Sequence, residues 1–348
     1  MPIFRSSRTR AASLLATFLL IVAGSGTARA KRYVWPMPQG QRRLVDPWTI
    51  AWDPTGDEPS LLVGEQGRIL RLALDGQWTE VAGTGEPGLN PDHREPGRRA
   101  LDARLGTVAG MVVMPDGSIV FTDFDNHLIR QVLADGTIRT VAGTGAPGDE
   151  DGLVTEAEFD HPCALALMPD GTLLVFDSAN YSLRAFRLEG KVETLIGPPE
   201  VEFGNSCGLA VSSRGRIVVG DAERSRLVEL ALDDKKAMTA RTIYAQAEPE
   251  GADIFQNTYL CDQYAVLAFA ADDQLVFNHL YTIDTWIESK GAVSLVGLDD
   301  QDPTASLDWI RFQDRVLPAS WSSVGVVRCL TAVPGGGRSA RGCVRVQG

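Results

Sequence analysis

Five polar residues occupy one recurring position in the sequence, ten residues before a turn glycine or the residue that replaces it. They are Asp46, Thr107, His161, Asn205 and Gln263. All carry side-chain oxygen or nitrogen atoms, and no two are identical. Such a set could hold a hydrated cation or orient a polar ligand. The alternative is an ordinary solvated surface at the start of each repeated unit.

This set restricts the metal chemistry that the chain could support. Catalytic zinc requires three protein ligands and an open position, and only Asp46 and His161 are good zinc ligands here. The remaining side chains are amides or a hydroxyl, whose oxygens suit a harder ion. We therefore expect either no cofactor or a single divalent cation, Ca²⁺ rather than Zn²⁺. No catalytic residue is identified from the sequence.

A second recurring series contains the acidic residues that follow each turn glycine by six positions. Its members are Asp123, Asp177 and Asp221, with Asn126 and Asn180 three residues after the first two. Because scaffold parts repeat whereas sites break symmetry, we expect structural roles, with each carboxylate accepting backbone N–H groups in a turn. We also expect His127, next to Asn126, on the surface or between repeated units.

Both series belong to a sequence repeat. Three segments align through their centres, 107–143, 161–197 and 205–232, and looser copies cover 46–83 and 263–297. Each contains short apolar runs broken by turn sequences such as Pro-Asp-Gly, which predicts four antiparallel strands. Four-stranded units of this kind are typical of β-propeller blades. The sequence therefore predicts an all-β fold, a six-bladed β-propeller of four-stranded antiparallel blades, with five or seven blades as alternatives.

The expected organisation is a signal peptide over 1–30 and a single propeller domain over 31–348. Clear blades cover 44–245, and a further blade covers 255–298. A degenerate closing blade would combine 303–348 with a strand at 31–36. Closing the ring in this way would remove exposed strand edges.

The first 30 residues have the features of a secretory signal. Arg5, Arg8 and Arg10 precede an apolar stretch at 11–23, and Ala28-Arg29-Ala30 offers a cleavage site. The apolar stretch is shorter than the roughly 20 residues that span a bilayer, although an uncleaved anchor is the alternative. We expect a secreted or periplasmic protein, and no membrane association beyond the cleaved signal.

Charge and cysteine content narrow the partners and the covalent structure. A formal net charge of −12 disfavours nucleic acid and anionic membranes, and we expect a monomer. Cys329 and Cys343 flank a glycine-rich loop and are expected to form a disulfide. Cys163 and Cys207 occupy equivalent positions, where we expect too large a separation for a disulfide. The pairing of Cys261 stays open.

Several motifs resemble NHL repeats. They are VAGTGEPG at 81–88, VAGTGAPGDEDG at 141–152 and the D-x-x-N-H-x-I-R pattern at Asp123–Arg130. The insert at 89–104 is similar to inter-blade loops of teneurin NHL propellers. The resemblance implies a platform that binds proteins, glycans or nucleic acid. A minority of the family are enzymes, including an amidating lyase with three zinc-binding histidines at channel positions, where this chain has only His161.

These observations predict an exported NHL-type propeller that acts as a binding or interaction scaffold. Its ligand, a protein, a glycan or a small polar molecule, would bind at the central channel mouth or on the loops 86–104 and 146–156. We expect a binding protein more than an enzyme. The alternative is a metal-dependent lyase or hydrolase, similar to the amidating lyase or to propeller lactonases, with Asp46 and His161 as candidate metal ligands.

Overall fold

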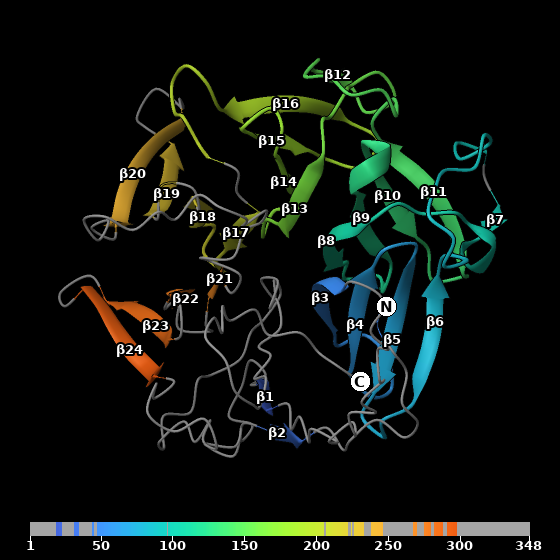
Figure 1. The fold of residues 1–348 in the computed structure, drawn as a ribbon, viewed down its shortest axis with the longest axis horizontal. Coiled ribbons are helices and arrows are strands. Elements are labelled where there is room, and N and C mark those ends of the chain that lie inside the picture. The colour runs from blue at the N-terminus through green and yellow to red at the C-terminus, as the bar shows by residue number, and fades with distance from the viewer. Residues whose placement is uncertain are drawn as a thin grey trace, which may run out of the picture.

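The computed structural model shows an all-β chain whose sheets surround a common centre (Figure 1). It describes residues 19–22, 31–34, 44, 47–95, 97–204, 207–221, 224, 226–232, 238–245, 267–269, 275–279, 282–287 and 291–297. Within these residues no helix is long and apolar enough to cross a membrane.

The described residues form five blades, which we number along the chain. Blade 1 contains β3 (Pro47–Asp53), β4 (Ser60–Glu65), β5 (Arg68–Ala73) and β6 (Trp78–Ala82). Blade 2 contains β8 (Val108–Val113), β9 (Ile119–Asp123), β10 (Leu128–Val132) and β11 (Thr137–Ala142). Blade 3 contains β13 (Pro162–Leu167), β14 (Leu173–Asp177), β15 (Ser182–Phe186) and β16 (Lys191–Ile196).

The last two described blades follow the same order. Blade 4 contains β17 (Gly208–Val211), β18 (Ile217–Asp221), β19 (Arg226–Leu232) and β20 (Met238–Ala245). Blade 5 contains β21 (Leu267–Phe269), β22 (Leu275–His279), β23 (Thr282–Ile287) and β24 (Gly291–Gly297). The prediction of a propeller with four-stranded antiparallel blades is thus confirmed. A sixth blade would use residues 303–348, which lie outside the described part of the chain.

Two blades carry an additional short strand on the outer edge. β7 (Arg98–Arg99) pairs with β11, and β12 (Gly152–Leu153) pairs with β16. Both come from the long loops that precede the innermost strands, and the first loop also contains the 3₁₀ helix η1 (Ala100–Asp102). These loops therefore cover backbone groups that an edge strand would otherwise leave unpaired.

Hydrophobic residues of neighbouring blades pack against one another and form the core. One cluster joins Leu62 of blade 1 to Phe121 of blade 2, and another joins Phe176 of blade 3 to Val219 of blade 4. These strands alternate in a period of two, which directs side chains toward the blades on both sides. The innermost strand β8 contacts both β3 and β13, so the order of the blades around the ring follows the sequence.

The N-terminal described segments form a separate two-stranded sheet. β1 (Leu19–Val22) pairs antiparallel with β2 (Lys31–Val34). The expected strand at 31–36 is therefore present over 31–34, whereas its expected partner lies outside the described residues. Cys329, Cys343 and Cys261 also lie outside them. The structure forms no disulfide between Cys163 and Cys207.

Candidate functional site

The recurring acidic residues close the second strand of their blades and are completely buried. Asp123 Oδ2 lies 3.2 Å from Arg130 Nη1, and Asp177 Oδ2 lies 3.0 Å from Arg184 Nη1. In blade 4 the corresponding distance is 2.8 Å, between Asp221 Oδ2 and Arg226 Nε. We call these contacts the Asp–Arg pairs.

The Asp–Arg pairs also hold the loop that leads into the innermost strand. The backbone N–H groups of Gly106, Asp160 and Gly204 donate to these carboxylates at 2.7, 2.7 and 3.0 Å. The backbone donors of Asp123 and Asp177 therefore come from the loop before the innermost strand, and the expected donors in the turn after the second strand are wrong for these two residues. Asp221 also accepts from that turn, where the backbone N–H of Arg224 donates at 3.2 Å. Burial raises the pKa of Asp177 to about 6, although its hydrogen bonds from Asn180 and Arg184 oppose that shift. The recurring asparagines add a bridge, because Asn126 and Asn180 donate to the carboxylates and to the carbonyl oxygens of Gly88 and Gly148.

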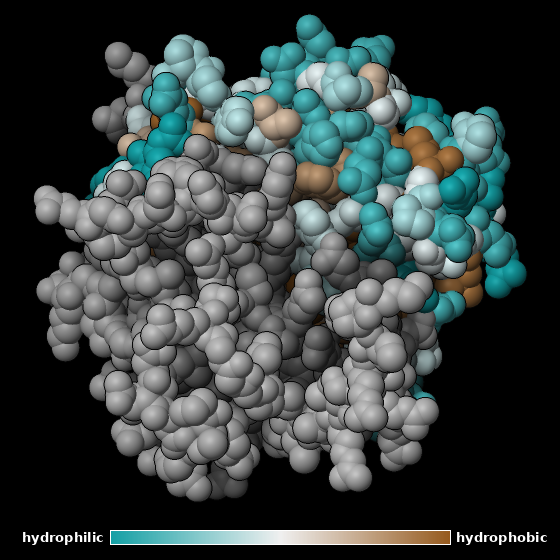
Figure 2. Space-filling view, in the orientation of Figure 1, coloured by the Kyte–Doolittle hydropathy of each residue, from teal (hydrophilic) through white to brown (hydrophobic). Residues whose placement is uncertain are grey.

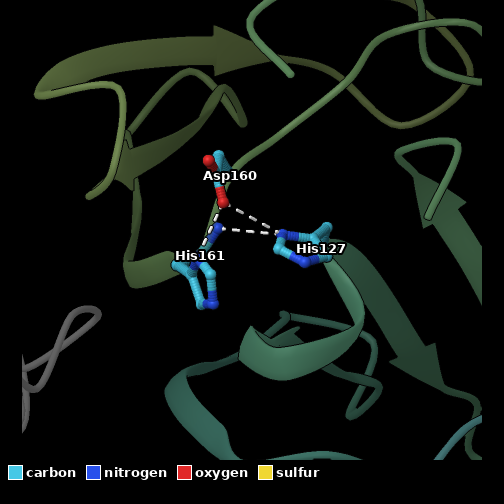
Figure 3. Close-up of side chains that lie close together, drawn as sticks. All are labelled: His127, Asp160 and His161. Atoms are coloured by element: carbon cyan, nitrogen blue, oxygen red, sulfur yellow. Dashed lines mark hydrogen bonds and ion pairs between the residues drawn. The ribbon is translucent and has the colours of Figure 1, made fainter. Parts of the chain in front are cut away.

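A cluster of three metal-ligating side chains lies between blades 2 and 3 (Figure 3). It contains His127, Asp160 and His161, and we call it the His–Asp–His cluster. His127 follows the 3₁₀ helix η2 (Phe124–Asn126), in the connection between β9 and β10. Asp160 and His161 directly precede β13. Neighbouring blades therefore supply the two sides of the cluster.

One carboxylate oxygen faces both imidazole rings. Asp160 Oδ1 lies 2.6 Å from His161 Nδ1 and 3.3 Å from His127 Nδ1. The backbone N–H of His161 donates to His127 Nδ1 at 3.2 Å. The side chains of His127, Asp160 and His161 are 14%, 29% and 41% exposed, so the cluster is open to solvent mainly at His161. Burial and the neighbouring His161 lower the pKa of His127.

Aromatic rings form one wall beside the cluster. The Phe124 ring centroid lies 4.7 Å from that of His161, and the Trp48 centroid lies 5.5 Å from that of Phe124. His127 and His161 meet edge to face with centroids 4.6 Å apart. The arrangement combines hydrogen-bonding groups with apolar ring faces, which is typical of sites that bind polar organic ligands.

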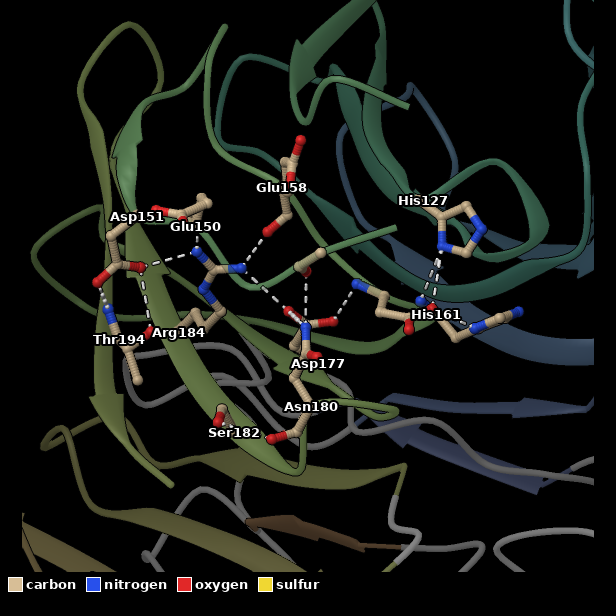
Figure 4. Close-up of polar contacts among 12 residues, drawn as sticks. His127, Glu150, Asp151, Glu158, His161, Asp177, Asn180, Ser182, Arg184 and Thr194 are labelled. Carbon is tan, nitrogen blue, oxygen red and sulfur yellow. Dashed lines mark hydrogen bonds and ion pairs between the residues drawn. The ribbon is translucent and has the colours of Figure 1, made fainter. Parts of the chain in front are cut away.

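Hydrogen bonds within blade 3 hold the residues that precede β13 in position (Figure 4). Ser178 Oγ donates to the carbonyl oxygen of His161 at 2.6 Å, and Asp177 accepts the backbone N–H of Asp160. Arg184 extends this network to Asp151 Oδ1 at 2.7 Å. Asp151 in turn accepts from the backbone N–H of Thr194. The position of His161 is therefore coupled to a buried ionic network.

Only two members of the predicted ligand-binding set fall within the described residues. Thr107 is buried, and its backbone N–H donates to Asp125 Oδ2 at 2.7 Å. His161 is half-buried and belongs to the His–Asp–His cluster. The other three members, Asp46, Asn205 and Gln263, lie outside the described residues. Of the two candidate metal ligands, the structure thus places His161 alone.

Sequence reasoning missed Asp160 and assigned no ligand role to His127. Asp160 stands where the flanking blades have Gly106 and Gly204, so a departure from the repeat was available as a signal. His127 stands where blade 3 has Tyr181, and both residues have a positive φ, 55° and 52°. Their shared backbone conformation belongs to the repeat, whereas the imidazole is particular to blade 2. His127 does lie between blades.

The fold and the repeat define a β-propeller with NHL-type repeats. No protein-family model matches the sequence. Curated relatives match part of the chain. Teneurin-3 of Danio rerio is 30% identical over 169 residues, which cover 42% of this chain and 6% of the teneurin. The teneurin match confirms the NHL resemblance of the repeats.

A second curated relative matches part of the sequence, and a solved structure has a similar fold. The protein SUPPRESSOR OF QUENCHING 1, chloroplastic, of Arabidopsis thaliana is 25% identical over 228 residues, covering 59% of this chain and 21% of the plant protein. The matched part of the chain thus spans only 21% and 6% of the length of these two relatives. A gluconolactonase of Xanthomonas campestris has a similar structure, with a TM-score of 0.52, 12% identity, and coverage of 74% of this chain and 78% of that one. At this identity the similarity shows the fold alone.

Proposed function

We propose that this chain is an exported propeller that serves as a binding scaffold, with a polar ligand held at the His–Asp–His cluster. One observation carries the proposal: three side chains converge, and none of them is repeated at the corresponding sequence positions of the neighbouring blades. Repeated residues support the architecture, whereas side chains that converge without being repeated require another explanation.

The chemistry of the cluster indicates the kind of ligand. His127, Asp160 and His161 supply donors and acceptors, and Phe124 supplies a neighbouring apolar ring face. A sugar residue or a polar peptide side chain presents both kinds of surface. Figure 2 shows a largely hydrophilic surface over the described blades, with small hydrophobic areas. We therefore favour a glycan, a protein segment or a small polar molecule over a membrane or nucleic acid.

The test measures binding to glycan and peptide arrays by the wild type, His161→Asn and Phe124→Ala. Binding that both substitutions weaken and Arg187→Met leaves unchanged would support the scaffold function. Arg187 is a suitable control because it forms an exposed ion pair with Asp170, in the loops of blade 3. Ligand capture that survives both cluster substitutions would contradict this location.

A second candidate function is hydrolysis or lyase chemistry at the same place. The 2.6 Å contact between Asp160 Oδ1 and His161 Nδ1 favours it, because a carboxylate that accepts from Nδ1–H orients Nε2 as a general base. The assay would use lactones and peptidyl-hydroxyglycine substrates with added divalent cations. Turnover that Asp160→Asn reduces, with a changed pH profile, would support catalysis. No turnover across both substrate classes would count against it.

A further inference from the structure

Three repeat positions meet at the junction between blades 2 and 3, and they carry His127, Asp160 and His161. The next junction has Tyr181, Gly204 and Asn205 at the corresponding positions in the sequence. The chain thus contains an internal reference that has the same repeat positions without imidazole or carboxylate groups.

The distances within the cluster approach those of a metal-binding site. One ligand atom from each of His127, His161 and Asp160 lies within 4.8 Å of the other two. Ligand atoms around tetrahedral zinc lie about 3.3 Å apart, since the bonds are about 2.0–2.1 Å long. The 3.3 Å separation of Asp160 Oδ1 and His127 Nδ1 already matches that value. The 2.6 Å contact with His161 needs a small rotation of two partly exposed side chains.

The arrangement of protons leaves one unfavourable contact. His127 Nδ1 accepts from the backbone N–H of His161, so this nitrogen is unprotonated in the structure. Its lone pair then faces Asp160 Oδ1, another acceptor, at 3.3 Å. The other tautomer would direct its N–H against the backbone N–H of His161. Either tautomer leaves two like groups opposed. A cation that takes the single Nδ1 lone pair would relieve the contact with Asp160 Oδ1, and it would replace the hydrogen bond from the backbone N–H of His161.

Local contacts hold the backbone around the cluster in place. His161 has a φ of 54°, a conformation that costs about 1 kcal/mol or more for a residue other than glycine. Thr107, its counterpart in blade 2, does not share it. Hydrogen bonds from Ser178 Oγ to His161 and from Asp160 N–H to Asp177 fix both ligand-bearing residues. In metal sites, supporting contacts of this kind orient the side chains that bind the metal directly.

We propose that His127, Asp160 and His161 bind one divalent transition-metal ion, best matched by Zn²⁺, with a remaining coordination position open to water or ligand. Two of the three ligand atoms are imidazole nitrogens, which favour Zn²⁺ over Ca²⁺. This inference deepens the proposed function, because the open position would contact the bound ligand, and it rests on the same residues. It also replaces the Ca²⁺ expectation at this place.

The experiment titrates Zn²⁺ alone into the chelator-treated, purified chain by calorimetry, and Co²⁺ with absorption as the readout. The variants are His127→Tyr, which takes its residue from blade 3, His161→Asn, which takes its residue from blade 4, and the isosteric Asp160→Asn. We expect one ion per chain, intense Co²⁺ bands typical of four-coordinate ligation, and affinity weakened about tenfold or more by each variant.

The control is His93→Ala, because His93 lies outside the cluster, where its Nδ1 contacts Thr140 Oγ1 at 3.0 Å. Unchanged affinity in the control supports the assigned site, whereas an equal loss overturns it. Thermal unfolding of each metal-free variant identifies any variant that fails to fold. The Co²⁺ titration of the wild type tests the proposal without any variant, and an absence of saturable binding there would overturn it. Binding to the arrays without metal binding would contradict the metal site and leave the scaffold function standing. Metal binding without binding to the arrays would contradict the scaffold function and leave the metal site standing.

Discussion

Asp123, Asp177 and Asp221 close the second strand of three consecutive blades, and each is buried beside an arginine. A buried ion pair contributes little net stability, but the loss of one partner leaves an uncompensated charge. The same residues also accept the backbone N–H groups of the loops that lead to the channel. At this scale, the Asp–Arg pairs position the His–Asp–His cluster without belonging to it.

Replacing Arg184 with methionine should destabilise the chain strongly. Asp177 would keep its burial and lose its counter-charge, which costs about 3–5 kcal/mol. Arg187→Met is the matched control, because its exposed pair with Asp170 contributes at most about 1 kcal/mol. Urea unfolding measures both values. Similar losses in the two variants would show that burial of the Arg184 pair is unimportant.

The pairs should also make stability depend on pH. Burial raises the pKa of Asp123 to about 6 from an ordinary value of 3.8. The folded state therefore binds this proton more tightly, so the contribution to stability is present below the ordinary pKa and is lost as the pH rises through about 6. From pH 7 to pH 4, the unfolding free energy of the wild type should rise by about 2–3 kcal/mol relative to that of Asp123→Asn. A difference that shrinks on acidification would mean that Arg130 outweighs burial.

At the scale of elements, the innermost strands approach so closely that side chains must be absent at some positions. A Cβ on Gly110 of β8 would lie 2.6 Å from the carbonyl oxygen of Cys163 and 2.9 Å from the backbone nitrogen of Leu165, both in β13. Backbone atoms at that distance cannot move without displacing a blade. Contact between the strands thus sets the spacing of blades 2 and 3, and with it the distance between His127 and Asp160.

Gly110→Ala should therefore destabilise the chain by about 2–3 kcal/mol through overpacking. It should also weaken any metal affinity of the His–Asp–His cluster, because the two blades carry different ligands. Gly56→Ala serves as the control, since Gly56 lies in an exposed loop of blade 1 and its added Cβ meets only Glu58. Chemical denaturation of the two variants checks the expectation. A tolerated Gly110→Ala would show that the blades can separate.

At the scale of the molecule, the proposed export would decide which residue is the N-terminus of the propeller. β1 pairs with β2 across the predicted cleavage site after Ala30. Cleavage there would remove β1 and leave β2 as the first strand of the mature chain. This segment would then be available to the closing blade that we propose as the sixth.

Intact-mass measurement of the chain recovered from the exported fraction should therefore show Lys31 as the first residue. Ala30→Arg is expected to block cleavage, since the signal site requires small residues, and to leave the longer chain. An exported protein that retains residues 1–30 would contradict the cleaved signal and would favour the uncleaved anchor.

The sequence by itself determined the architecture and the register of the repeat. Turn glycines such as Gly117 and Gly171, with φ of 82° and 86°, and the alternation of short strands are local properties, so they are visible without a structure. Only the tertiary structure brought His127 and Asp160 together, because they come from different blades and 32 residues of chain lie between them. In the ring, the connection between the second and third strands of blade 2 lies against the residues that precede the innermost strand of blade 3. A local sequence pattern cannot predict which side chains meet there.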